Sequence, residues 1–170
     1  GSQQKKNGGE DLKGEARRLG SRREQVGEEV YEAENIVIAT GGSPFVPPIP
    51  GVEQAHVVTS KEILSVEELP ASLVVVGGGV IGIEFASFFS SLGVKVDVIE
   101  MLDEIIPFMD REQAAAFRKA LRGMVDFHLE CRVQAIDGHD VRYVDADGNE
   151  NVLPADLVLM SVGRAPNVNG

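Results

Sequence analysis

The sequence predicts an α/β fold: a three-layer domain whose parallel sheet carries helices on one side and a three-stranded antiparallel meander on the other. Three observations support this prediction. Short β-branched runs alternate with segments of helical period in the middle of the chain. One of these runs leads through a glycine-rich turn directly into a helix. Closely spaced strand patterns, separated by Asp-Gly pairs, occupy the C-terminal third.

The parallel strands and the helices are predicted from the spacing of apolar residues and from the residues that begin and end helices. Strands are predicted over 73–76, 95–99, 126–129 and 157–162, and the apolar runs 73–76 and 157–162 are expected to be buried. Apolar side chains recur at helical spacing from Val80, and Gly93 stops that helix after residue 92. A second helix is expected over 110–123, with Asp110 as its N-cap and Gly123 at its end.

The meander is predicted from the alternation of apolar and polar side chains. Residues 132–136, 141–144 and 150–153 alternate between apolar and polar side chains. The pairs Asp137-Gly138 and Asp147-Gly148 between them are strong hairpin signals. We therefore expect three antiparallel strands in place of a crossover helix.

The N-terminal part differs from the rest. Residues 1–34 are rich in glycine and charge, and we expect them to be partly disordered or loosely packed. Residues 35–40 are predicted as a buried strand, and the proline-rich stretch 43–51 as an extended linker. We place the domain boundary here, with an N-terminal segment over 1–42 and the main domain over 43–167.

Composition excludes several classes of function. The 170 residues carry a net charge of −11, which repels a phosphate backbone and argues against nucleic-acid binding. No apolar stretch is long enough to predict a membrane span. Cys131 is the only cysteine, which favours a reducing cytoplasm and excludes a cysteine metal cluster. The three histidines have no metal-site spacing, so we expect no metal site and read them as surface or hydrogen-bonded residues.

The glycine turn is the strongest functional signal. In a strand-turn-helix context, the first glycine of such a motif permits the tight turn and the second lets the backbone approach a pyrophosphate. The third lets the helix pack closely on the strand. Amide groups at the start of the helix would then face the phosphates, aided by the helix dipole. The turn predicts a Rossmann-like dinucleotide site made by Gly77, Gly78, Gly79, Val80, Ile81 and Gly82.

Glu100 indicates which dinucleotide the site prefers. It ends the second strand, 23 positions after Gly77, where a carboxylate can accept hydrogen bonds from the adenosine ribose hydroxyls. The same carboxylate would repel a 2′-phosphate, and no basic residue follows before Arg111. We therefore predict NAD rather than NADP as the cofactor; the alternative is that Glu100 only caps a strand end.

Several motifs occur together in a fixed order. They are ENIVIATGG ending at Gly42, the linker with Ile49-Pro50-Gly51, VVVGGGVIGIE ending at Glu84, VDVIE ending at Glu100, and SVGRAPN ending at Asn167. In this combination the chain resembles the pyridine nucleotide-disulfide oxidoreductases, most closely their dihydrolipoamide dehydrogenase branch. The resemblance covers about residues 35–167.

The resemblance implies a homodimeric flavoprotein that passes electrons from dihydrolipoamide through a redox disulfide and FAD to NAD. Such enzymes serve 2-oxoacid dehydrogenase complexes or the glycine cleavage system, with a lipoyl domain as substrate. This chain lacks the first FAD fingerprint, the cysteine pair and the dimerisation domain that the family carries. We therefore expect a fragment that binds no FAD, has no catalytic residue of its own, and is inactive without the missing FAD and dimerisation domains.

The resemblance also places three residues near the cofactor. Glu84 would lie beside the nicotinamide end, although an acid that favours the helix dipole is an equal alternative. The Gly163 backbone would meet the nicotinamide half, or simply form a turn. Val133 would touch the adenine, but a core valine on an alternating strand is the simpler interpretation.

Other functions stay open at this point. Within the same family, an NADH oxidase, a CoA-disulfide reductase, a soluble transhydrogenase or a mercuric reductase would share the central motifs. Outside it, the chain could be a non-catalytic nucleotide-binding or regulatory module. A reading frame that encodes an upstream cysteine pair and a downstream domain with a His–Glu pair would decide against the module.

Overall fold

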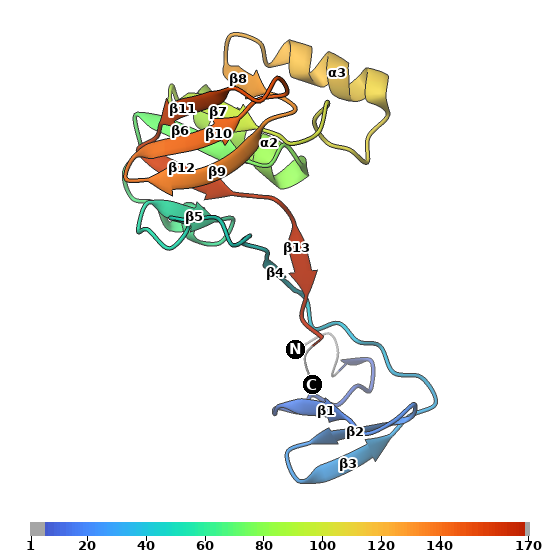
Figure 1. The fold of residues 1–170 in the computed structure, drawn as a ribbon. Coiled ribbons are helices and arrows are strands. Elements are labelled where there is room, and N and C mark those ends of the chain that lie inside the picture. Colours follow the sequence, from blue (N-terminus) through green and yellow to red (C-terminus); the bar gives the residue numbers. More distant parts are fainter. Residues whose placement is uncertain (1–5, 169–170) are drawn as a thin grey trace. The chain divides into compact units, whose positions relative to one another are not determined.

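The computed structural model describes residues 6–168. These fall into two compact units. One comprises residues 6–41 with 166–168, and the other comprises Gly42–Ala165. The second unit contains the glycine turn and Glu100, and it is described first (Figure 1).

A five-stranded sheet forms the centre of this unit. Its order is β5-β12-β6-β7-β8, and each neighbouring pair is parallel. The strands are β5 Val57–Thr59, β6 Ser72–Val76, β7 Lys95–Ile99, β8 Val125–His128 and β12 Leu157–Met160. Because all carboxyl ends lie at one edge, the segments that follow β6, β7 and β12 meet there, which is where ligands bind in open α/β sheets.

The sheet is buried on both faces, as its near-continuous aliphatic runs predict. Leu73 and Val75 of β6 point into a core shared with the helices, whereas Val74 and Val76 point into a core shared with the meander. All four are at most 5% exposed. Each such side chain contributes about 1.5–3 kcal/mol to folding. The start of the sheet is held by Ser72, whose backbone N–H and hydroxyl both donate to the Asp156 carboxylate at 2.9 and 3.1 Å.

The described helices pack on one face. Helix α2, Val80–Ser91, follows β6, and helix α3, Arg111–Ala120, follows β7. The Asp110 side chain caps α3 by accepting from the Glu112 and Gln113 N–H groups, which confirms the predicted N-cap. A short 3-10 turn, η1 Glu62–Ser65, buries Ile63 in the same core.

The meander covers the other face. Strands β9 Arg132–Asp137, β10 Asp140–Val144 and β11 Glu150–Pro154 pair antiparallel in the order β11-β10-β9. Both predicted hairpins form at the Asp-Gly pairs: Asp137 ends β9 just before the first turn, and Asp147-Gly148 lies within the second. Buried residues of β9 and β10, among them Val141 and Ile136, meet the sheet in the second core. The three-layer α/β fold is therefore confirmed.

The other unit contains a small antiparallel sheet that the sequence did not predict. Its strands are β1 Ala16–Arg18, β2 Arg23–Val26 and β3 Glu29–Glu32, in the order β1-β2-β3. Most of its side chains are exposed, including Leu19 and Val30. Two further short strands, β4 Gly42–Pro44 and β13 Arg164–Pro166, pair with each other.

One predicted strand is wrong. Residues 35–40 form no strand, and Val37 and Ile38 are 87% and 57% exposed. A buried strand needs neighbouring strands for its backbone groups and a layer for its side chains, and no described strand pairs with this segment. The apolar composition of 35–40 was therefore not sufficient to form a strand here.

Candidate functional site

The predicted glycine turn lies at the carboxyl edge, between β6 and α2. Gly77 has φ of 104°, a conformation that favours glycine. Its N–H donates to the Ile99 carbonyl at 2.9 Å, and a Cβ added here would lie 2.7 Å from the Ser161 carbonyl oxygen. Gly77 therefore ends β6 in a turn that no other residue type fits without strain.

Gly82 allows α2 to approach the sheet. A Cβ at this position would lie 2.2 Å from the Gly77 carbonyl oxygen and 2.6 Å from the Ser161 hydroxyl oxygen. Real Cβ atoms do not come so close, so a side chain here would push the helix outward. Gly82 thus has the packing role predicted for the third glycine.

Gly79 faces open space. Its φ is −71°, it is the N-cap of α2, and an added Cβ would meet nothing within 4 Å. The N–H groups at the start of a helix have no partner within it. No partner is found for those of Val80, Ile81 and Gly82 in the part of the chain that the structure describes. The turn therefore presents free donors beside a space without side chains, which fits a bound phosphate.

Glu100 reaches the same turn from the end of β7. Its side chain is 9% exposed. One carboxylate oxygen accepts from the Gly78 N–H at 2.6 Å, and the other accepts from the Leu102 N–H at 2.8 Å. The predicted acid thus lies at the glycine turn, and it is hydrogen-bonded to the backbone.

The loop after Glu100 folds back over the turn. The Ile106 N–H donates to the Gly78 carbonyl at 2.8 Å, and Ile105 is fully buried. Ile106 has φ of 48°, which is unusual for a β-branched residue. Such conformations persist where surrounding contacts hold them, often at functional sites.

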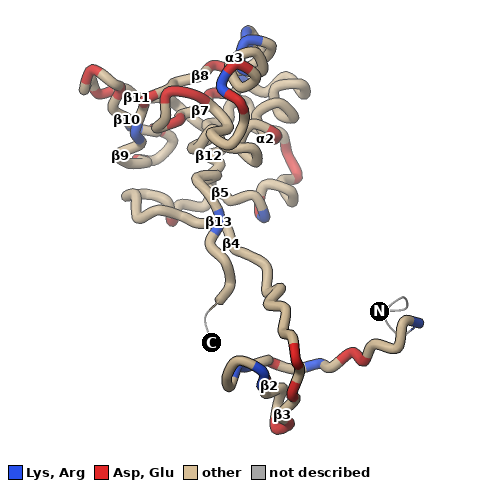
Figure 2. Tube along the Cα trace, turned by 90° about the vertical axis from the view of Figure 1, so that its right-hand side faces the viewer, with Lys and Arg blue, Asp and Glu red and all other residues tan. Residues whose placement is uncertain are grey.

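Two acidic side chains of this loop are paired with arginines of α3. Glu104 accepts from Arg118 at 2.7 and 3.0 Å, and this bidentate ion pair lowers the pKa of the carboxyl. Arg111 donates to Asp103 at 2.5 Å, which lowers the pKa of that carboxyl in the same way. Figure 2 shows acidic and basic stretches next to each other at α3. Neither guanidinium is left to offer an unpaired positive charge near Glu100.

Ser161 is a residue of this site that the sequence analysis did not single out. It follows β12, and its hydroxyl lies 3.0 and 2.9 Å from the carbonyl oxygens of Val76 and Gly77. It thus holds the turn to the neighbouring strand. A serine in SVG carries no signal of its own, and only the parallel pairing of β12 with β6 reveals this contact. Gly163, two residues later, is exposed, and its carbonyl accepts from the Phe45 N–H at 3.0 Å.

The remaining predicted site residues lie farther along. Glu84 is exposed on the second turn of α2, beside a mostly apolar groove of about 500 Å³ that also includes Val80, Phe88 and Phe117. Val133 is 7% exposed and packs in the core under the meander, together with Cys131. Burial raises the pKa of the Cys131 thiol, as expected for a packed cysteine.

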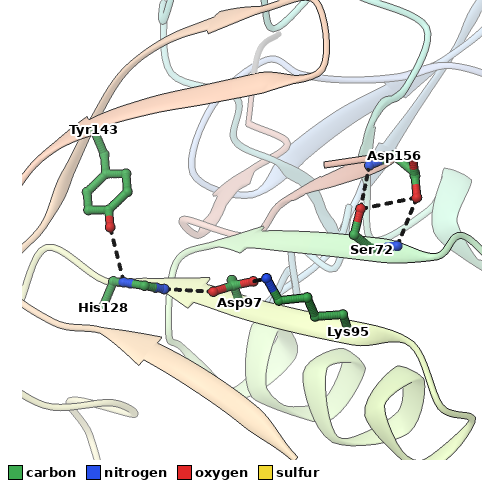
Figure 3. A network of polar contacts seen from close by, with 6 residues as sticks. All are labelled: Ser72, Lys95, Asp97, His128, Tyr143 and Asp156. Atoms are coloured by element: carbon green, nitrogen blue, oxygen red, sulfur yellow. Dashed lines mark hydrogen bonds and ion pairs between the residues drawn. The ribbon is translucent and has the colours of Figure 1, made fainter. Parts of the chain in front are cut away.

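A second polar cluster lies between the sheet and the meander (Figure 3). The buried Asp97 of β7 contacts His128 Nε2 at 2.8 Å and Lys95 Nζ at 3.7 Å. Tyr143 of β10 reaches the other ring nitrogen of His128 at 3.2 Å. This cluster joins the meander to the sheet. Among residues 6–168, no group of three His, Cys, Asp or Glu side chains is arranged to hold a metal ion, and no helix is long and apolar enough to cross a membrane.

The sequence of this chain is similar to those of known proteins. Residues 4–170 match the family described as pyridine nucleotide-disulphide oxidoreductase. A dihydrolipoyl dehydrogenase from Acholeplasma laidlawii is 47% identical over 147 residues, which cover 84% of this chain and 44% of the relative. A dihydrolipoyl dehydrogenase from Bacillus subtilis is 36% identical over 172 residues, covering 98% of this chain and 38% of the relative. The chain therefore spans less than half the length of these relatives.

Solved structures give the same result. The HOCl-induced flavoprotein disulfide reductase RclA from Escherichia coli is 32% identical with a TM-score of 0.75, over 93% of this chain and 37% of that one. A ferredoxin reductase for the CYP199A2 system from Rhodopseudomonas palustris is 25% identical with a TM-score of 0.79. The similarity there covers 98% of this chain and 44% of that one.

Proposed function

Because this chain belongs to the pyridine nucleotide-disulphide oxidoreductase family, we propose that it is the NAD-binding part of a dihydrolipoyl dehydrogenase. The observation that carries the proposal is the geometry at Gly79. Open space, an absent side chain and free N–H groups coincide at the N-terminus of a 12-residue helix. A pyrophosphate would accept hydrogen bonds from these donors and would be favoured by the helix dipole.

Preference for NAD over NADP follows from the surrounding charge. The Glu100 carboxylate would accept hydrogen bonds from the ribose hydroxyls and would repel a 2′-phosphate. The guanidinium groups of Arg111 and Arg118, which contact the loop after Glu100, are already paired with Asp103 and Glu104. A 2′-phosphate at this site would therefore meet the fixed negative charge of Glu100, and these two arginines would not offset it.

The chain's contribution to the reaction is binding and orientation. Bound NAD supplies a hydride acceptor, and the chemistry of transfer belongs to the cofactors. In this proposal the glycine turn fixes the pyrophosphate and Glu100 the adenosine. Gly163, at the carboxyl edge after β12, and Glu84, one helical turn beyond the phosphate donors, would then meet the nicotinamide half.

We further propose that these 170 residues do not catalyse the reaction of the relatives by themselves. A redox disulfide needs two cysteines, and Cys131 is the only one present and is buried. FAD-binding and dimerisation parts would be contributed by the rest of the enzyme, and a lipoyl domain would be its substrate. The purified chain should accordingly be colourless, and a flavin absorbance band would contradict this point.

Calorimetric titration of the purified chain with NAD and with NADP tests the proposal. We expect NAD to bind at least about tenfold more tightly, which corresponds to about 1.4 kcal/mol. Equal or tighter binding of NADP would refute the argument from Glu100. Binding of neither dinucleotide would refute the proposed function of the isolated chain.

The similarity to RclA favours a second candidate, another flavoprotein disulfide reductase with the same NAD-binding part. The two candidates agree on the glycine turn and Glu100. They differ in the disulfide region, so assay of a full-length enzyme with dihydrolipoamide as the reductant distinguishes them.

A further inference from the structure

We propose that Glu100 is a positioning residue for the phosphate-binding turn, in addition to any contact with the ribose. This inference rests on the proposed function and deepens it, because it makes one carboxylate responsible for two properties of the site. Cofactor preference and the shape of the turn would then be coupled, and a substitution of Glu100 could not change one of them alone.

The contacts of Glu100 carry the inference. Its carboxylate joins two segments that are far apart in sequence, through the Gly78 N–H at 2.6 Å and the Leu102 N–H at 2.8 Å. Its own backbone N–H donates to the His128 carbonyl at 2.9 Å, and its carbonyl accepts from the Cys131 N–H at 2.9 Å. Every polar atom of the residue is thus used to hold main chain in place.

The backbone of Gly78 is held through both its N–H and its carbonyl. Its N–H is held by Glu100, and its carbonyl accepts from the Ile106 N–H at 2.8 Å. A Cβ at Gly78 would lie 3.2 Å from the Glu100 carboxylate and from Ile105. Glycine at this position therefore leaves room for the Glu100 side chain to reach the Gly78 N–H. This peptide cannot offer its N–H to a phosphate. The donors left for a pyrophosphate are those from Gly79 onward, and their direction depends on how Gly78 is held.

Glu100→Gln removes this arrangement with little change in shape. Both partners of the carboxylate are N–H donors, and an amide side chain has only one acceptor oxygen. Either the Gly78 or the Leu102 N–H must therefore lose its acceptor inside a buried site. A residue that only contacts the ribose would leave the turn unchanged when substituted.

Amide hydrogen exchange tests this prediction without any ligand. We expect exchange at Gly78 or Leu102 to become at least about tenfold faster in Glu100→Gln, since a lost hydrogen bond to a charged group corresponds to about 10- to 100-fold. The Gly77 amide, bonded to the Ile99 carbonyl, is the internal control and should change little. Unchanged exchange at both Gly78 and Leu102 would overturn the proposal.

A ligand comparison separates positioning from ribose contact. The probe is an NAD analogue whose adenosine ribose lacks both hydroxyls, compared with NAD on wild type and on Glu100→Gln. Positioning predicts that the variant binds the analogue at least about fivefold more weakly than wild type does, because the phosphate donors are displaced. Binding of the analogue within twofold in the two proteins would show that Glu100 acts on the ribose alone.

Two further variants complete the design. Glu112→Gln makes the same change of charge at an exposed position in the first turn of α3 and should leave both readouts unchanged. Glu100→Asp keeps the charge but is one methylene shorter, and it should also speed exchange at Gly78 or Leu102, which provides a test if Glu100→Gln folds poorly. Failure of wild type to bind NAD would refute the proposed function, whereas the exchange measurement would still decide the role of Glu100.

Discussion

The carboxyl edge of the sheet and the surface under the meander each contain a buried acidic residue. Asp97 lies in β7, Glu100 directly follows this strand, and the two residues have different partners. Glu100, at the end of β7, is bonded through its side chain to backbone N–H groups only. Asp97, in the middle of β7, contacts the side chains of His128 and Lys95. They are 9% and 4% exposed.

The difference in partners indicates a difference in role. Backbone donors are part of the turn itself, so Glu100 controls where main-chain groups point at the edge where a ligand would bind. The partners of Asp97 come from β7, β8 and, through His128, from β10, so Asp97 holds two layers together. Substitutions at the edge should therefore change ligand binding, and substitutions under the meander should change stability.

The largest expected effect is a loss of stability from a substitution at the edge, where the comparison otherwise predicts an effect on ligand binding. Gly82 lies at the edge, but its role is packing, because an added Cβ would lie 2.2 Å from the Gly77 carbonyl oxygen. We expect Gly82→Ala to lower the free energy of unfolding by about 3 kcal/mol through overpacking. Urea unfolding measures this change. Gly79→Ala is the matched control, and its stability should stay within about 0.5 kcal/mol of wild type.

Gly79→Val should change ligand binding at the edge without changing the fold. The backbone there is extended, with ψ of 177°, and the added side chain meets no neighbour, so the fold should be retained. The side chain would fill the space proposed for the pyrophosphate. We expect affinity for NAD to fall at least about 100-fold, or about 2.7 kcal/mol, by calorimetry. Retained affinity with a native circular dichroism spectrum would mean that the phosphate lies elsewhere.

Asp97→Asn is the counterpart under the meander. The asparagine keeps the shape but loses the charge that faces Lys95 and His128. We expect the free energy of unfolding to fall by about 2 kcal/mol, the usual value for a hydrogen bond to a charged group. Affinity for NAD, measured on the folded variant, should be unchanged. A loss of NAD affinity larger than the loss of stability would contradict the separation of the two regions.

Glu104→Gln sharpens the comparison, since Glu104 lies in the loop at the edge but has a side-chain partner. Arg118 holds the pKa of Glu104 below its ordinary value of 4.5, so the ion pair stabilises the folded state above that pH. The stabilisation is lost as the pH falls through the lowered pKa. We expect Glu104→Gln to cost about 1 kcal/mol at neutral pH, and the difference from wild type to shrink toward zero as the pH falls through the lowered pKa. A difference that persists undiminished in acid would exclude the ion pair as its cause.

The smallest expected effect is that of Tyr143→Phe. It removes one hydroxyl, which lies 3.2 Å from the His128 ring, and keeps the buried aromatic ring. Thermal unfolding should report a loss of about 0.5–1 kcal/mol. An effect as large as that of Asp97→Asn would show that the hydroxyl, rather than the carboxylate, is the main polar link between the layers.

The sequence predicted best where a pattern and its local chemistry agree. The strand before Gly77, the helix after Gly79 and the hairpins at the Asp-Gly pairs depend on nearby residues, and all three were confirmed. Burial of β-branched runs on both faces also follows directly from composition. The structural roles of Gly77 and Gly82 were predicted by the same reasoning, because an added Cβ at either position would clash with the backbone.

What the sequence missed depends on partners far along the chain. Ser161 supports the turn only because β12 lies beside β6, and the hydrogen bonds of Glu100 become visible only when the turn and loop are folded around it. The predicted strand at 35–40 was wrong because apolar residues form a strand only with a neighbour to pair with. Asp97 gave no signal, since its partners His128 and Tyr143 come from other strands.

Backbone amide chemical shifts of the ¹⁵N-labelled chain, recorded during titration with NAD, test the central claim most directly. If the turn holds the pyrophosphate, the largest shifts should fall on the amides of Gly79, Val80, Ile81 and Gly82, and the amides around Asp97 should move little. Binding of NAD with its largest shifts away from this turn would contradict the account.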